Sequence, residues 1–193
     1  MQKSNRFVLK GPACLLLSFV FMISACSDDE PSVVQIVNDD LEGSNAWQFV
    51  NVAPATHAGV VVSSVSASSS HSLSTTSSVA QSGGFSFWRL SVTPPDIHVG
   101  SSLELTVKVK VTNVTGNGVF VALRGDGDSS SSSIFFETTQ DVQTINGTAD
   151  FTSYTVKLDS YPEGVKYIYI FLIMHASSTG SANFDDISLI SRH

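Results

Sequence analysis

Aromatic and basic side chains recur at alternate positions in several apolar runs of this chain. In Val165–Met174, three aromatic rings alternate with an unbroken row of Ile, Leu and Met. A β-strand would place these two rows on opposite faces of a sheet. Two other runs, around Phe87 and around Phe120, show the same separation. The residues expected on the ring-bearing face are Tyr167, Tyr169, Phe171, His175, Phe120, Arg124 and Arg89.

These residue types suit a ligand that has both apolar faces and hydroxyl groups. An aromatic ring offers a flat apolar surface, whereas arginine and histidine donate hydrogen bonds. Aromatic patches that face solvent usually mark a binding surface. The alternative is that a loop or a second layer covers the rings, and the sequence leaves both readings open.

The sequence lacks motifs for catalysis. Its glutamates are scattered, and no pair of carboxylic acids suggests the acid–base chemistry of glycoside hydrolysis. Neither a G-x-S-x-G nor an H-E-x-x-H motif occurs. His57, His71, His98 and His175 are far apart in the chain, so they do not indicate a zinc site. We therefore expect no enzymatic activity.

Short strands would position these residues. Leu103–Val111 (LELTVKVKV) alternates strictly between apolar and polar residues, as an antiparallel strand with one buried face does. A turn-rich link at 112–118 joins it to Val119–Arg124, so the two runs predict a hairpin. Ser63–Ser78 is rich in Ser and Thr and predicts two solvated edge strands with a loop. Further strands are predicted at Val33–Ile36, Trp47–Val52, Val60–Ser66, His71–Thr76, Phe85–Val92, Ile134–Thr138, Phe151–Leu158, Val165–Met174 and Ala182–Ile190.

Many short strands with turn residues between them, and no segment of helical period, predict an all-β sandwich or barrel. The formal net charge of -7 argues against a nucleic-acid binder, which needs a basic face. Only 14% of the residues are charged, too few for a coiled coil.

The N-terminal segment predicts export. Lys3, Arg6 and Lys10 precede the apolar run Ala13–Ile23, which is about half as long as the roughly 20 residues of a membrane-spanning helix. Small residues before Cys26 resemble the lipobox of bacterial lipoproteins, which implies acylation of Cys26. The acidic residues that follow resemble a surface-export signal of lipoproteins in glycan-degrading Gram-negative bacteria.

We therefore expect a lipoprotein signal peptide at 1–25, an acidic tether at 26–32 and a β-sandwich domain at 33–193. The expected location is the outer membrane, lipid-anchored and exposed at the cell surface. Cys14 would leave with the signal peptide, so the mature domain would have no disulfide.

Three motifs, in order, resemble carbohydrate-binding modules of the family 4, 9 and 22 type. Asn38–Glu42 followed by Trp47 resembles their opening N-G-D-F-E…W. Phe87–Leu90 and then Gly100–Leu105 resemble their middle strands, and Asn183–Leu189 resembles their closing F-x-x-D-D-V-x-L. The resemblance covers nearly the whole chain after residue 32. It implies a galactose-binding-like jelly roll, a β-sandwich of two antiparallel sheets that binds glycans without cleaving them.

The resemblance also implies a structural Ca²⁺ where the first and last strands meet, with Glu42, Asp185 and Asp186 as its ligands. Carboxylate oxygens suit Ca²⁺. Asp185 would share the core-facing side of its strand with Ile187 and Leu189, where an unpaired carboxylate is costly. A hydrogen-bonded or salt-bridged pair of aspartates is the alternative.

We therefore expect a surface-anchored lipoprotein that binds a polysaccharide or oligosaccharide for partner enzymes and transporters that act on glycans. A structural or adhesive module for protein–protein contacts is the main rival, because sandwiches serve both purposes. A small glycan-active enzyme is the third alternative.

Overall fold

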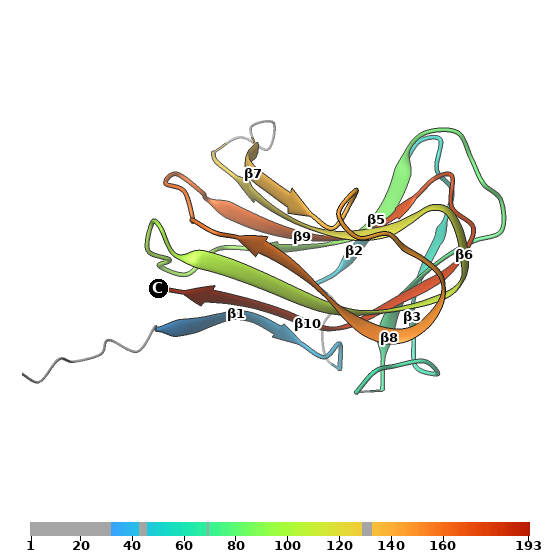
Figure 1. Ribbon diagram of the computed structural model, residues 1–193, viewed down its shortest axis with the longest axis horizontal. Helices are drawn as coiled ribbons and strands as arrows, with labels where there is room; N and C mark the ends of the chain where they lie inside the picture. Colours follow the sequence, from blue (N-terminus) through green and yellow to red (C-terminus); the bar gives the residue numbers. More distant parts are fainter. Residues whose placement is uncertain (1–31, 43–45, 69, 129–132) are drawn as a thin grey trace, which may run out of the picture. The chain divides into compact units, whose positions relative to one another are not determined.

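Ten β-strands and no helix make up the part of the chain that the computed structural model describes (Figure 1). Residues 32–42, 46–68, 70–128 and 133–193 are described, and they belong to one unit, Pro31–His193. Within these ranges, no helix is long and apolar enough to cross a membrane. The predicted signal peptide and Cys26 lie outside the described residues.

The strands are β1 (Val33–Asp39), β2 (Gln48–Val52), β3 (Ala58–Val62), β4 (Ser72–Ser77), β5 (Phe85–Val92), β6 (Ser102–Asp126), β7 (Ser133–Thr138), β8 (Ile145–Leu158), β9 (Tyr167–His175) and β10 (Gly180–Arg192).

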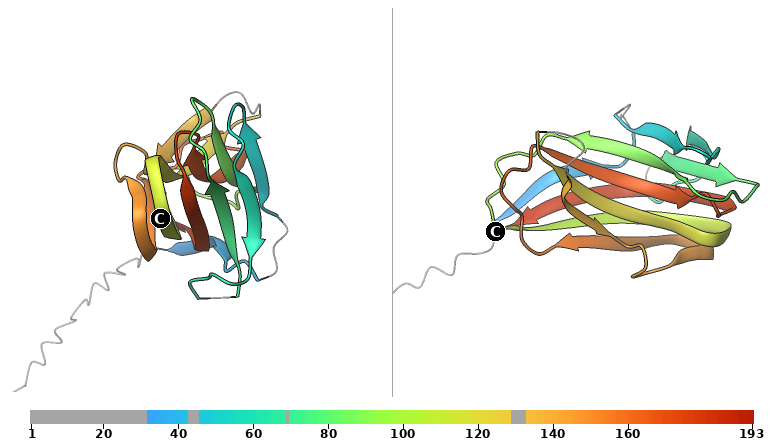
Figure 2. Two further views of the ribbon diagram at one scale, coloured as in Figure 1. Left: turned by 90° about the vertical axis from the view of Figure 1, so that its right-hand side faces the viewer. Right: turned by 90° about the horizontal axis from the view of Figure 1, so that it is seen from above.

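The strands form two antiparallel layers that share β6 (Figures 1 and 2). In the first sheet, the N-terminal half of β6 lies between β8 and β10. The strand β10 also pairs with β1 and β4, and β4 pairs with β3. The second sheet has the order β2-β5-β9-β6-β7 and uses the C-terminal half of β6. This jelly-roll sandwich confirms the predicted fold class.

The long strand β6 shows that the predicted hairpin is wrong. Residues 102–126 form one strand of 25 residues, which bends from the first sheet into the second (Figure 1). In the bend, Asn113, Gly116 and Gly118 have positive φ angles of 52°, 69° and 76°. The register against β8 also shifts between Val111 and Val119. The turn-type residues therefore bend a strand through bulges and do not reverse the chain.

Alternating apolar rows of both sheets form one core. The row of β6 that starts at Leu103 and the row of β9 that starts at Ile168 belong to the same cluster of buried side chains. Both rows are at most 1% exposed, and each such Leu or Ile contributes about 1.5–3 kcal/mol by its burial. Trp47 and Trp88 join this core, as predicted. Because one face of β9 is fixed in the core, its other residues must lie on the outer face.

The strand β4 differs from the predicted pair of solvated edge strands. Only β3 lies at an edge, because β4 pairs with β3 on one side and with β10 on the other. Ser72 is fully buried, and its hydroxyl donates a 2.6 Å hydrogen bond to the Val65 carbonyl. It also accepts a 3.1 Å bond from the Asn183 side chain. Hydroxyls with such partners are stable in an interior strand, so a high serine content does not establish exposure.

Candidate functional site

The outer face of the second sheet carries a row of aromatic rings along β9. Tyr167, Tyr169 and Phe171 occupy successive outward positions, with ring centroids 6.4 Å and 6.0 Å apart. The intervening Ile168 and Ile170 are fully buried in the core. The alternation of this strand therefore places the rings as predicted. We call the outward side chains of β5, β9 and the C-terminal half of β6 the aromatic face.

Neighbouring strands complete a second apolar cluster on this face, separate from the core. Phe87 of β5 packs edge-on against Phe171, with ring centroids 5.2 Å apart. Phe120 and Ala122 of β6 and Ile173 of β9 are buried in the same cluster. The rings thus support one another on the outside of the sheet, where packing fixes their orientation before any ligand arrives.

A cleft of about 490 Å³ lies over this cluster. Its volume falls within the range of about 300–1,000 Å³ that is typical of small-molecule sites. The predicted residues Arg89, Phe120, Arg124, Phe171 and His175 all line it. Tyr169 lines an adjoining side pocket of about 330 Å³ with Gln48 and Ser91, and Arg89 lines both hollows. Tyr167, which is 44% exposed, lies beyond the cleft at the start of β9.

Polar groups around the cleft are held by specific partners. The Arg89 guanidinium donates a 2.7 Å hydrogen bond to the Gln48 side-chain carbonyl and lies 5.8 Å from the Tyr169 ring centroid. The Nε of Arg124 lies 2.6 Å from an oxygen of Asp126, a residue that is 2% exposed. Such contacts already restrict these side chains. A ligand that bound them would therefore lose less side-chain entropy.

The sequence prediction missed four residues that line the cleft. Phe85 and Ile173 follow the same alternation as Phe87 and Phe171, so the pattern could have identified them. Phe136 lies opposite Arg124 because β7 pairs with the C-terminal half of β6. No local feature of the sequence indicates that pairing. The same is true of the position of Gln140 after β7.

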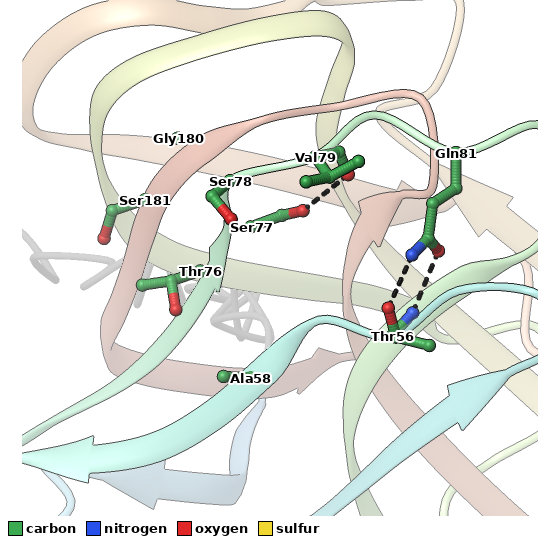
Figure 3. Close-up of a pocket in the computed structure, with 9 residues that line it drawn as sticks. All are labelled: Thr56, Ala58, Thr76, Ser77, Ser78, Val79, Gln81, Gly180 and Ser181. Atoms are coloured by element: carbon green, nitrogen blue, oxygen red, sulfur yellow. Dashed lines mark hydrogen bonds between the residues drawn. The ribbon is translucent and has the colours of Figure 1, made fainter.

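A second hollow of about 480 Å³ lies at the edge of the first sheet, where β3, β4 and β10 meet (Figure 3). The described residues of its lining carry hydroxyl groups but no aromatic ring and no charge. Some of its polar groups are already paired: the Thr56 amide donates to the Gln81 side chain at 3.0 Å, and the Ser77 hydroxyl donates to the Val79 carbonyl at 3.0 Å. This hollow therefore lacks the stacking surface that the cleft offers.

The predicted calcium ligands do not come together as a metal site in the described residues. No group of three His, Cys, Asp or Glu side chains there is placed to hold a metal ion. Glu42 accepts hydrogen bonds from the Ser70 amide and hydroxyl, which lower its pKa to about 2 together with a smaller effect of His71. Asp186 lies 2.7 Å from the Lys108 ammonium, so a side-chain cation is already present beside it.

Asp185 lies on the opposite face from the one predicted. A bulge in β10 between Asp185 and Ser188 shifts the alternation, so Asp185 pairs with Lys108, whereas Leu189 pairs with the core residue Leu105. Asp185 is nevertheless fully buried and accepts 2.7 Å hydrogen bonds from the amides of Ala67 and Asp186. Burial raises its pKa, while these amides oppose that effect. In the described residues both aspartates thus have hydrogen-bond or ion-pair partners, and calcium stays a prediction that melting with a chelator would test.

Comparisons with known proteins relate the chain through its fold alone. The sequence matches no known family profile and no curated protein. Among solved structures, a family 11 carbohydrate-binding module from Clostridium thermocellum, in complex with a β-1,3-1,4-mixed-linked tetrasaccharide, has a TM-score of 0.53 at 14% identity. The match covers 81% of this chain and 94% of that module. A family 22 xylan-binding domain from Paenibacillus barcinonensis has a TM-score of 0.52 at 11% identity, with coverages of 83% and 96%.

Proteins with other activities share the same fold. A Stig cyclase from Fischerella sp. TAU, in complex with a 3H-indole compound, has a TM-score of 0.60 at 15% identity, and the match covers 83% of this chain and 98% of the cyclase. The enzymatically active domain of tailspike protein 4 from bacteriophage CBA120 has a TM-score of 0.56 at 15% identity, with 78% of this chain covered. This chain spans only 20% of that tailspike chain. The comparisons therefore show the jelly-roll fold of carbohydrate-binding modules, and function must be argued from the site.

Proposed function

We propose that this protein binds a polysaccharide or oligosaccharide at the aromatic face, without cleaving it, while a lipid on Cys26 anchors it to the outer membrane. The observation that carries the proposal is the cleft of about 490 Å³ over the ring cluster of β5, β6 and β9. Apolar faces of sugar rings can stack on Phe171 and its neighbours. Sugar hydroxyls can accept hydrogen bonds from Arg89 and from the other basic side chains of the lining.

The chemistry of the lining supports binding without cleavage. Glycoside hydrolysis typically uses two carboxyl groups about 5–9 Å apart across the sugar. Among the described residues, no aspartate or glutamate lines the cleft or the side pocket. The fold shared with carbohydrate-binding modules is consistent with a glycan ligand.

The anchor rests on the sequence around Cys26, which resembles a lipobox. A lipid on Cys26 and the short tether after it would keep the sandwich close to the membrane surface. Partner enzymes and transporters that process glycans would then receive the polysaccharide at that surface.

Affinity electrophoresis in gels that contain individual polysaccharides tests this proposal. We expect at least one polysaccharide to retard the protein. Tyr169→Ala should weaken that retardation at least tenfold, which corresponds to about 1.4 kcal/mol. The partly exposed Phe151, whose ring lies 5.9 Å from the Lys110 ammonium, lines neither the cleft nor the side pocket that contains Tyr169. Phe151→Ala is therefore a matched control that should bind normally.

Three outcomes would count against the proposal in different ways. Migration that no polysaccharide changes would overturn glycan binding and favour the protein–protein module. Equal weakening by Tyr169→Ala and Phe151→Ala would move the site away from the aromatic face. Release of shorter glycans from a bound polysaccharide would show an enzyme.

A further inference from the structure

The charge of the two hollows on the aromatic face differs from the charge of the domain. Residues 32–193 contain 14 Asp and Glu against 7 Lys and Arg. The described residues that line the cleft and the side pocket nevertheless include Arg89, Arg124 and His175 and no acidic residue. The lining of the cleft and the side pocket is thus basic in an acidic domain, and such a local field favours an anionic ligand.

The two arginines of this face play different parts. Arg124 lies against the buried Asp126, with 2.6 Å between Nε and Oδ1, so its charge is balanced within the protein. Arg89 hydrogen-bonds to the neutral side chain of Gln48 and lies beside the neutral ring of Tyr169. Among the described residues, no carboxylate oxygen lies within 4.0 Å of Arg89. In that part of the chain, its positive charge is therefore left without an ion-pair partner.

Arg89 lies where a bound sugar would meet it. On β5 it is the cross-strand neighbour of Gln48 on one side and of Phe171 on the other. It lines both the cleft and the side pocket, so a sugar stacked on either Phe171 or Tyr169 would have the guanidinium beside it. A guanidinium presents several N–H donors in a planar fork that matches the oxygens of a carboxylate or a similar oxyanion.

We propose that the ligand is an anionic glycan and that Arg89 holds its oxyanion, the carboxylate of a uronic acid or a sulfate ester. This inference rests on the proposed glycan binding and specifies the class of glycan. The rings provide the stacking surface, and Arg89 provides selection by charge.

The test compares polymers that differ mainly in charge. Retardation of the purified protein is measured with several polyuronates, with the methyl esters of the same polymers, with sulfated galactans and with neutral galactans and glucans. We expect an anionic polymer to bind at least tenfold more tightly than its uncharged counterpart, and we expect added salt to weaken this binding. Comparing the polyuronates with the sulfated galactans identifies whether Arg89 holds a carboxylate or a sulfate ester.

Variants of Arg89 separate charge from geometry. Arg89→Gln should remove the preference for the anionic polymer, whereas Arg89→Lys should recover only part of it, because lysine lacks the planar fork. Arg192→Gln removes the same charge from an exposed position on β10 in the first sheet and should leave binding unchanged. Circular dichroism spectra show whether each variant is folded.

The inference and the proposed function can fail separately. Binding to neutral polymers alone, or equal binding to acid and ester, would overturn the anionic ligand and leave glycan binding intact. An unchanged preference in a folded Arg89→Gln variant would remove Arg89 from its role. Binding to none of the polymers would overturn both proposals.

Discussion

At the scale of single residues, the aromatic face has an unusual feature, because its rings are partly buried by one another. Phe87 and Phe120 are 9% and 8% exposed although they point away from the core. This packing stabilises the rings and leaves their exposed edges to form the floor of the cleft. A ligand that bound there would therefore cost little side-chain entropy.

His57 should make stability depend on pH near one end of this face. It is 4% exposed, and burial lowers its pKa from the ordinary value of 6.5, with the nearby His175 lowering it further. The folded state therefore binds fewer protons than the unfolded state below pH 6.5, so the free energy of unfolding falls as the pH drops through that range.

We expect the melting temperature to fall more steeply between about pH 8 and about pH 5 in the native protein than in His57→Gln. Melting curves across this range measure the difference in slope. His98→Gln changes an exposed histidine and should keep the native slope. Identical slopes in the native protein and His57→Gln would show that His57 does not cause the pH dependence.

At the scale of elements, β6 connects the two sheets and brings Phe120 and Arg124 to the aromatic face. Its bend depends on backbone conformations that glycine adopts most easily. Gly118 has a φ of 76°, and a Cβ there would lie 2.5 Å from the Ile145 carbonyl oxygen. Any larger residue would have to displace the backbone of β8.

Gly118→Ala should therefore destabilise the fold more than Gly147→Ala. Gly147 has a similar φ of 77°, but a Cβ there would meet no atom within 4 Å, so only backbone strain of about 1–3 kcal/mol applies. Urea unfolding of both variants measures the two losses. If Gly118→Ala cost no more than Gly147→Ala, close packing at the bend would not hold the two halves of β6 in place.

Strict alternation allowed the sequence to predict most of these elements and most of the site. Alternation around Phe87, from Val119 to Arg124 and from Tyr167 onward fixes which side chains face outward, so all seven predicted binding residues lie on one sheet face. Where a bulge or a bend interrupts alternation, the sequence pattern was misleading. It placed Asp185 on the wrong face and predicted a hairpin within β6.

Pairing between distant strands determines the features that the sequence did not predict. Phe136 reaches the cleft only because β7 pairs with β6, and Ser72 is buried because β4 lies between β3 and β10. Long-range pairing depends on the whole sheet, and no single segment encodes it.

At the scale of the whole molecule, we propose a binding domain joined to a lipid anchor at Cys26. If Cys26 is acylated, a labelled fatty-acid analogue supplied to cells that make the full chain should be incorporated into the protein. Cys26→Ser should abolish the label, and Cys14→Ser should retain it, because Cys14 lies in the predicted signal peptide. Labelling of the Cys26→Ser variant, or none in the native chain, would contradict the anchor.

We propose above all that a glycan binds on the aromatic face of the second sheet. Two-dimensional NMR spectra of the labelled protein, titrated with an oligosaccharide from the polysaccharide that retards it most, test this most directly. We predict that the signals that shift come from Arg89, Phe171, Arg124 and His175 and from their neighbours in β5, β9 and the C-terminal half of β6. Shifts confined to β8 and β10, or to the hydroxyl-lined hollow around Thr76, would contradict it.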